Sequence, residues 1–201
     1  MGKKTGILGG TFNPIHTGHL ILGEQAMDEL KLDKVIFMPS GYSYMKAQSD
    51  ILPGEHRLRM TELAVADNPR FEVSDMEIKR EGATHTADTL RELKEHDPEI
   101  QIYYIVGADT LFMMEKWIEP EVIFSNCVVL AAIRDDVDQS ELKQKAEQLT
   151  ERFNARIEVL ATSCIDISSR MIRRRISRKQ SVRYYLPESV RKYIEENELY
   201  I

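Results

Sequence analysis

Two histidines follow a pair of glycines near the start of the chain, within Gly9–His19. Gly9 and Gly10 leave backbone N–H groups open to an anion, and a helix that begins after them adds its positive end. His16 and His19 lie three residues apart, so both imidazoles point at the same spot, where they can stabilise charge on a phosphoryl group. The segment therefore predicts a phosphate-binding loop.

The same residues allow other interpretations. The histidine pair could ligate zinc, although no third ligand lies nearby in the sequence. The two glycines could form a plain turn, and His16 could be a core histidine with satisfied hydrogen bonds. A dinucleotide-binding fingerprint is excluded, because the chain has no G-x-G-x-x-G pattern. We favour phosphate binding and expect no metal ligated by the protein itself.

A second anion site is predicted at Ile167–Arg173. Ser168 and Ser169 can cap a helix there and donate hydroxyl groups, and Arg173 lies about one turn into that helix. The surrounding segment Ile167–Pro187 holds seven basic residues and no acidic one, in a chain whose net charge is −6. A solvated helix face would also explain the charge. Two phosphate cradles, each after a strand, suggest a polyphosphate that is held at both ends.

A third group of candidate residues lies further along the chain. Thr86 and Asp109 each follow a strand or begin a helix, as ligand-binding residues of such folds do. Trp117 is the only tryptophan, and it is either a core side chain or a stacking platform for a flat ligand. Its place near the predicted active edge keeps both interpretations open.

The elements that must position these residues alternate between short apolar runs and amphipathic segments. This alternation predicts an α/β fold with a single doubly wound parallel sheet. Ligands of such sheets bind at the carboxyl ends of the strands, where the candidate residues lie. The predicted strands are Thr5–Leu8, Lys34–Met38, Phe71–Ser74, Gln101–Val106, Asn126–Ile133 and Arg156–Leu160. The predicted helices are Gly18–Leu30, Glu55–Asp67, Thr86–His96, Asp109–Lys116, Ser140–Asn154, one from Ser168 to about Ile176, and one from Pro187.

Length and composition set the wider limits. The chain has 201 residues, which suggests a single domain, 1–201, with 166–201 as a C-terminal helical part that carries the second phosphate motif. A net charge of −6 argues against a nucleic-acid binder. The longest apolar run, Cys127–Ile133, is too short for a membrane span, and no signal peptide is evident. Two isolated cysteines, Cys127 and Cys164, fit a reducing compartment. We expect a cytoplasmic protein that contacts no membrane.

A series of motifs follows one order along nearly the whole chain. The series resembles the bacterial nicotinate-nucleotide adenylyltransferases, members of the paired-histidine nucleotidylyltransferase superfamily. Asn13 stands where that family has aspartate, and Arg170 stands where it has threonine. The matching segments are Gly9–Leu20, Pro39–Lys46, Glu55–Met60, Glu77–Leu90, Gly107–Asp109 with Trp117, Arg134, Ile167–Arg173 and Val182–Ile194.

The resemblance implies a Rossmann-like fold and the reaction of ATP with nicotinate mononucleotide to deamido-NAD and pyrophosphate, with Mg²⁺ bound to the ATP phosphates. It implies that His16, His19 and Arg173 are the catalytic residues. A homo-oligomer is compatible with it. The residues implied for ATP are Gly9, Gly10, Thr11, Phe12, Gly107, Ser168, Ser169 and Arg173. Those implied for the mononucleotide are Asn13, Lys46, Thr86, Asp109, Trp117 and Arg134.

Two other functions stay open at this point. One is a related nucleotidylyltransferase with another acceptor, either nicotinamide mononucleotide or phosphopantetheine. Thr86 and Trp117 argue against phosphopantetheine, because they suit a flat aromatic acceptor. The other is a non-catalytic regulator that binds nucleotides, against which the intact His16, His19 and Arg173 argue.

Overall fold

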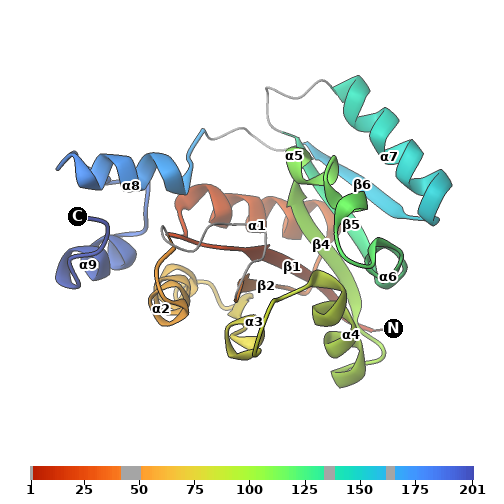
Figure 1. Cartoon of the computed structure of the whole chain (residues 1–201), viewed down its shortest axis with the longest axis horizontal. Helices are drawn as coiled ribbons and strands as arrows, with labels where there is room; N and C mark the ends of the chain where they lie inside the picture. Colours follow the sequence, from red (N-terminus) through yellow and green to blue (C-terminus); the bar gives the residue numbers. More distant parts are fainter. Residues whose placement is uncertain (1, 42–50, 134–138, 162–165) are drawn as a thin grey trace.

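The computed structural model of the chain describes residues 2–41, 51–133, 139–161 and 166–201. It contains one six-stranded sheet with helices on both sides (Figure 1). The strands are β1 Lys4–Gly10, β2 Lys34–Pro39, β3 Phe71–Val73, β4 Gln101–Gly107, β5 Cys127–Ile133 and β6 Arg156–Ala161. The helices are α1 Thr17–Leu30, α2 Gly54–Val65, α3 Met76–Lys79, α4 Thr86–His96, α5 Ala108–Leu111, α6 Pro120–Asn126, α7 Gln139–Phe153, α8 Ser169–Ser177 and α9 Glu188–Glu196, with a 3₁₀ turn at Met114–Lys116.

The strands run in the order β3-β2-β1-β4-β5-β6, and every neighbouring pair is parallel. The predicted doubly wound parallel sheet is therefore confirmed. The order changes direction between β1 and β4, so the chain leaves these two neighbours toward opposite sides. The crevice beyond the carboxyl ends of β1 and β4 is where such a sheet binds ligands. Gly9–Gly10 and Gly107 lie at these two strand ends.

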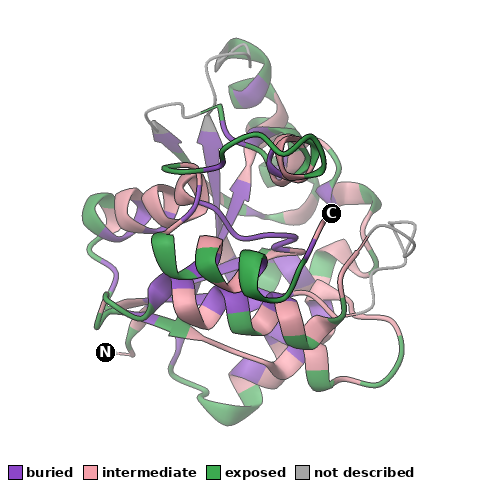
Figure 2. Ribbon diagram, turned by 90° about the vertical axis from the view of Figure 1, so that its left-hand side faces the viewer, coloured by how far each residue is buried: buried purple, intermediate pink, exposed green. Residues whose placement is uncertain are grey.

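Alternate side chains of the strands enter two apolar clusters, one on each face of the sheet. Leu8 of β1 and Phe37 of β2 pack with residues of α1, α2, α8 and α9. Ile7 of β1 and Val129 of β5 pack with residues of α4, α5, α6 and α7. Both faces of the inner strands are thus covered, as their continuous apolar runs predict. Figure 2 shows the buried residues gathered in the sheet and on the inner sides of the helices.

Residues 166–201 pack on the first of these faces. Ile172 of α8 and Val190 and Ile194 of α9 belong to the same buried cluster as Leu8 and Phe37. The His56 ring on α2 shares a hydrogen bond of 2.9 Å with the Tyr193 hydroxyl on α9. Figure 1 shows α8, α9 and α2 grouped at one end of the molecule. The segment that carries the second phosphate motif is therefore fixed to the sheet by apolar packing.

Several local predictions were wrong. The expected helix Asp109–Lys116 is divided into α5 and a 3₁₀ turn, and the short helices α3 and α6 were not predicted, because four to seven residues show no helical period. By contrast, α4 begins at Thr86 and ends at His96 as predicted, with His85 in the cap position. On α2, Arg57 occupies a buried position and the neighbouring Leu58 is only half-buried.

Two expectations about composition can be compared with the structure. Cys127 is buried, as expected of a small apolar side chain, and burial raises the pKa of its thiol to about 12. Cys164 lies outside the described residues. No helix of the described part of the chain is long and apolar enough to cross a membrane.

Candidate functional site

The loop after β1 is shaped by close contacts beneath its glycines. A Cβ atom at Gly9 would lie 2.9 Å from the Tyr104 hydroxyl oxygen, and one at Gly10 would lie 2.9 Å from the Phe12 ring. A larger residue at either position would therefore have to displace the Tyr104 or the Phe12 side chain. Phe12 itself is buried and has a φ of 46°, in the left-handed region that non-glycine residues rarely adopt. The sequence at 9–12 thus fixes one particular path for the loop.

The two histidines lie against each other at the start of α1. Their rings are stacked with centroids 3.7 Å apart and planes 22° apart. The backbone N–H of His16 donates to Nδ1 of His19 at 3.2 Å, and the His19 N–H donates to the His16 carbonyl at 2.9 Å. Because Nδ1 of His19 accepts a hydrogen bond, its neutral ring carries the hydrogen on Nε2. The pair is a rigid unit at a helix N-terminus.

Arg57 contacts the loop after β1 through its guanidinium group. Its guanidinium donates to the carbonyls of Thr11 at 2.8 Å, Ser40 at 2.7 Å and Leu52 at 3.0 Å. Only 4% of the residue is exposed, and burial lowers the pKa of the guanidinium. One buried cation therefore ties together the loop after β1, the segment after β2 and the segment before α2. The sequence matched Arg57 to a family helix but indicated no such role.

The second predicted anion motif lies directly on the first. Ser168 caps α8, and its Oγ accepts from the Met171 N–H at 3.2 Å, as predicted. Ser169 Oγ donates to the Pro14 carbonyl at 2.8 Å, and Arg173 donates to the Asn13 carbonyl at 2.8 Å. The structure thus brings the two motifs together. It also shows both side chains on backbone carbonyls of the loop, contacts that the sequence did not reveal.

The Asn13 side chain is a second junction of the loop. Its Oδ1 accepts from the Leu52 N–H at 3.3 Å and from the Tyr200 hydroxyl at 2.8 Å. Only 4% of Asn13 is exposed. This residue was predicted to face the mononucleotide, whereas the contacts shown here place its oxygen within the protein. Tyr200 was not identified by sequence, because nothing in the local pattern connects residues that lie 187 positions apart.

On the other side of the crevice, Tyr104 connects residues predicted for the mononucleotide. Its hydroxyl lies 3.4 Å from the Thr86 Oγ1, and its ring meets the Trp117 ring nearly at right angles with centroids 6.4 Å apart. Thr86 and Trp117 are both half-buried, and Asp109 is exposed beside Gly107. A Cβ at Gly107 would lie 2.6 Å from the Asp109 carboxylate, so a larger residue there would require this exposed side chain to move. Thr86, Tyr104 and Trp117 therefore form one connected group of side chains.

A network of polar side chains around the buried Glu77 holds the helix on which Thr86 lies. The Glu77 carboxylate accepts from the Thr89 hydroxyl at 2.8 Å, and Arg80 donates to the same hydroxyl oxygen at 2.8 Å. Burial raises the pKa of Glu77, while Thr89 and Arg80 lower it. Arg80 also pairs with Glu92 at 2.6 Å. These contacts join α3 to α4 and so fix the start of α4, where Thr86 lies.

Two predicted site residues, Lys46 and Arg134, lie outside the described residues. Within the described ranges, no group of three or more His, Cys, Asp or Glu side chains could hold a metal ion. The side chains around the loop after β1 are imidazoles, hydroxyls and guanidinium groups. Hydroxyl and guanidinium groups can donate hydrogen bonds to phosphate oxygens, as a protonated imidazole nitrogen can.

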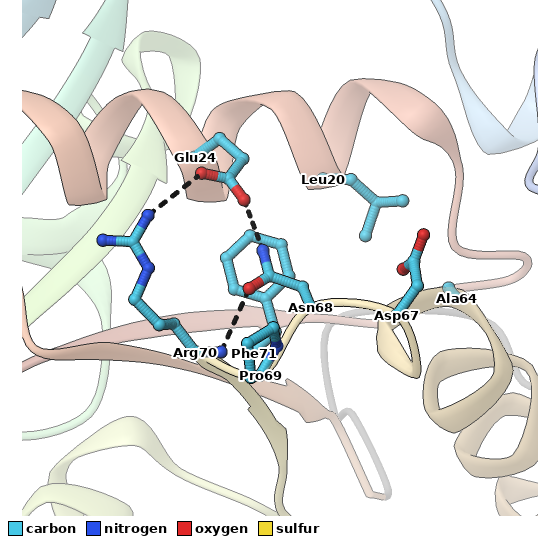
Figure 3. A pocket seen from close by; sticks show the side chains of 8 residues that line it. All are labelled: Leu20, Glu24, Ala64, Asp67, Asn68, Pro69, Arg70 and Phe71. Atoms are coloured by element: carbon cyan, nitrogen blue, oxygen red, sulfur yellow. Dashed lines mark hydrogen bonds and ion pairs between the residues drawn. The ribbon is translucent and has the colours of Figure 1, made fainter.

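A separate cavity lies between α1 and the turn that leads into β3 (Figure 3). Leu20 and Glu24 line it from α1, and Asp67–Phe71 lines it from the turn. The Glu24 carboxylate contacts the Asn68 amide and lies 3.9 Å from the Arg70 guanidinium. Of the described residues that line this cavity, none belongs to the predicted nucleotide site.

The comparisons with known proteins agree with this geometry. Residues 7–175 match the cytidylyltransferase-like family. A protein of Lachnoclostridium phytofermentans is 47% identical over 99% of this chain and 100% of its own length, and one of Dehalococcoides mccartyi is 44% identical over 98% and 97%. Both carry the name "Probable nicotinate-nucleotide adenylyltransferase". A Plasmodium falciparum nicotinic acid mononucleotide adenylyltransferase complexed with NaAD has the same fold, with a TM-score of 0.81 at 18% identity over 98% of this chain and 97% of that chain.

Proposed function

This chain belongs to the cytidylyltransferase-like family and, within it, to the nicotinate-nucleotide adenylyltransferases, and we propose that it transfers AMP from ATP to nicotinate mononucleotide. The products are deamido-NAD and pyrophosphate. One observation carries the proposal: the paired histidines begin a helix at the carboxyl edge of the sheet, and Ser169 and Arg173 of the second motif lie against the same loop. Such an arrangement suits the two ends of a triphosphate. We further propose that the protein works in the cytoplasm.

The reaction needs positioning and charge neutralisation. A phosphate oxygen of the mononucleotide attacks the α-phosphorus of ATP, a new P–O bond forms, and the bond to the β-phosphate oxygen breaks with loss of pyrophosphate. The attacking group is already an anion, so no strong general base is required. We assign His16 and His19 to charge that develops at the α-phosphate, and Ser169 and Arg173 to the leaving β,γ-phosphates. No covalent intermediate with the protein is expected.

We propose that Mg²⁺ enters with the ATP phosphates. A magnesium ion usually keeps several waters and binds through substrate phosphates, so it needs no complete cage of protein ligands. The Ser169 hydroxyl and the Arg173 guanidinium beside the loop fit this arrangement, because both groups can donate hydrogen bonds to phosphate oxygens. The bound ion would neutralise part of the triphosphate charge.

The first prediction concerns the choice of acceptor. Wild-type protein should release pyrophosphate from ATP with nicotinate mononucleotide about 10–200 times more efficiently, in kcat/KM, than with nicotinamide mononucleotide. The acid presents two acceptor oxygens, which suit the Thr86 hydroxyl and nearby backbone N–H groups, whereas the amide turns an N–H toward one of these donors. Phosphopantetheine, tested as a third acceptor in the same assay, should give no pyrophosphate. A ratio near one, or a preference for the amide, would overturn the acceptor assignment.

Two variants distinguish recognition of the nicotinate carboxylate from stacking on the pyridine ring. Thr86→Val keeps the shape of the side chain and removes its hydroxyl. The ratio of kcat/KM for nicotinate mononucleotide to kcat/KM for nicotinamide mononucleotide should therefore fall toward one. Trp117→Ala should lower kcat/KM for both mononucleotides and leave their ratio nearly unchanged, because the indole would stack on either ring. An unchanged ratio in Thr86→Val would refute the assignment of its hydroxyl.

Arg173→Ala tests whether Arg173 binds ATP and not the mononucleotide. The variant should bind ATP about 10–100 times more weakly, the cost of a lost charge-assisted hydrogen bond, with a lower kcat. Calorimetry with the mononucleotide alone should show little change. Arg174→Ala is the matched control, because Arg174 is an exposed neighbour on α8. Equal losses for both substrates in Arg173→Ala would contradict the assignment to the β,γ-phosphates.

A further inference from the structure

The segment after α9 turns back toward the loop after β1. Glu198 and Tyr200 have φ values of 51° and 66°, in the left-handed region, and Leu199 between them is buried in the apolar cluster beside α9. Non-glycine residues keep such backbone angles only where surrounding contacts fix them. The Tyr200 hydroxyl donates a hydrogen bond of 2.8 Å to the Asn13 Oδ1.

Asn13 is where three distant segments meet. Its side-chain oxygen accepts from Tyr200 and from the Leu52 N–H, and its backbone carbonyl accepts from Arg173 at 2.8 Å. Asn13 is almost fully buried, so its side-chain oxygen depends on protein donors. A change in the orientation of this one residue would therefore move the carbonyl that holds Arg173 and the loop that leads to His16.

The Tyr200 hydroxyl is the hydrogen-bond donor in its contact with Asn13. Burial raises the pKa of the phenol, and the nearby Arg173 and Arg57 lower it, with burial the larger influence. The group therefore keeps its hydrogen in neutral solution. Asn13 Oδ1 has no hydrogen of its own, so the direction of the bond is fixed from the tyrosine to the amide oxygen.

Another tyrosine of the same part of the chain makes a bond of similar length elsewhere. Tyr193 on α9 pairs with His56 on α2 at 2.9 Å, and both residues are half-buried. This bond joins α9 to α2 but does not involve the loop after β1. Residues 188–200 therefore contain two tyrosines whose hydroxyl groups bond to other parts of the protein. Of the two, only Tyr200 contacts the loop after β1.

We propose that Tyr200 is a positioning residue for the nucleotidyl transfer, because its hydroxyl fixes the Asn13 amide and thereby the loop that places Arg173 and the two histidines. The inference rests on the proposed function and deepens it. Tyr200 acts through Asn13 and is assigned no contact with substrate. An aspartate at position 13 also offers an acceptor oxygen to Tyr200 and to the Leu52 N–H, so Asn13→Asp should preserve the junction.

The test compares Tyr200→Phe with Tyr193→Phe. Both variants lose one hydroxyl hydrogen bond, so both should show a similarly small fall in thermal stability. Tyr200→Phe alone should lower kcat/KM for ATP, by about five- to tenfold, with the KM for nicotinate mononucleotide unchanged. Equal kinetic effects in the two variants, or wild-type kinetics in Tyr200→Phe, would overturn the positioning role.

A double-mutant cycle identifies the path of the effect. In an Asn13→Ala background the further change Tyr200→Phe should have no kinetic effect, whereas in an Asn13→Asp background it should keep its full effect. Additive losses in the alanine background would show that Tyr200 acts by another route, and the proposal would fail.

Amide hydrogen exchange provides a readout that does not depend on catalysis. Exchange of peptides covering residues 11–19 should become faster in Tyr200→Phe and stay unchanged in Tyr193→Phe. If wild-type protein releases no pyrophosphate with any mononucleotide, the proposed function fails, while the exchange result still decides whether Tyr200 holds the loop. Unchanged exchange in Tyr200→Phe would refute that contact in solution.

Discussion

His19→Ala is expected to reduce kcat by about 10²–10³-fold, the typical cost of losing a donor that stabilises charge developing in a transition state. We assign this residue two separable functions. Its Nδ1 accepts from the His16 N–H at the start of α1, which leaves Nε2 to carry the hydrogen that we assign to the α-phosphate. The alanine variant removes both functions. Single-turnover pyrophosphate release with saturating substrates would measure the chemical loss.

Two further substitutions separate capping from catalysis. In His19→Asn the side chain can still accept from the His16 N–H but has no group at the position of Nε2, so folding stability should be kept and kcat lost. His96→Ala is the control, since His96 is exposed at the end of α4. More than half of wild-type activity in either His19 variant would refute its assignment to the α-phosphate.

Arg57→Ala is expected to lower the free energy of unfolding by about 3–5 kcal/mol, because Arg57 serves three carbonyls and an acceptor left without a donor costs about 1–3 kcal/mol. The substitution leaves the carbonyls of Thr11, Ser40 and Leu52 without the donor that they share. Each of these half-buried carbonyls loses a hydrogen-bond donor, and the removed side chain leaves a cavity. Urea denaturation followed by circular dichroism would measure the change.

Arg59→Ala on the same helix is the matched control. Arg59 is exposed and pairs only with Glu62, at 3.0 Å, among the described residues. An exposed pair of this kind contributes about 0.2–1 kcal/mol, so the control should stay close to wild type. If Arg57→Ala costs no more than Arg59→Ala, the guanidinium does not tie the three segments together in solution.

The sheet could be predicted from the sequence because its signals are local. Continuous apolar runs such as Val35–Met38 and Cys127–Ile133 show strands buried on both faces, and glycine or proline marks where several of them end. The loop after β1 was equally visible as a candidate site, because its glycines and histidines lie within eleven residues, Gly9–His19. The site of such a fold follows from the topology once the strands are known.

The contacts that hold the site could not be predicted, because they join residues far apart in sequence. Arg57, Tyr104 and Tyr200 act through single hydrogen bonds or close contacts to a loop near residue 10, and nothing in their neighbouring residues shows this. Arg57 in particular occupies an inward helical position that periodicity assigns to an apolar side chain. Its three carbonyl partners compensate for the cost of burying its charge.

The order of the chain has a consequence for how the enzyme is made. The loop at residues 13–17 emerges early in synthesis, yet Ser169, Arg173 and Tyr200, which hold it, follow 155, 160 and 187 residues later. At about 5–20 residues per second, this separation leaves the loop without these contacts for roughly 10–40 s on the ribosome. The strands β1 to β6 can pair during that interval, but the nucleotide site is completed only afterwards. A nascent chain therefore lacks the contacts of Ser169, Arg173 and Tyr200 with this loop until its last residues have been made.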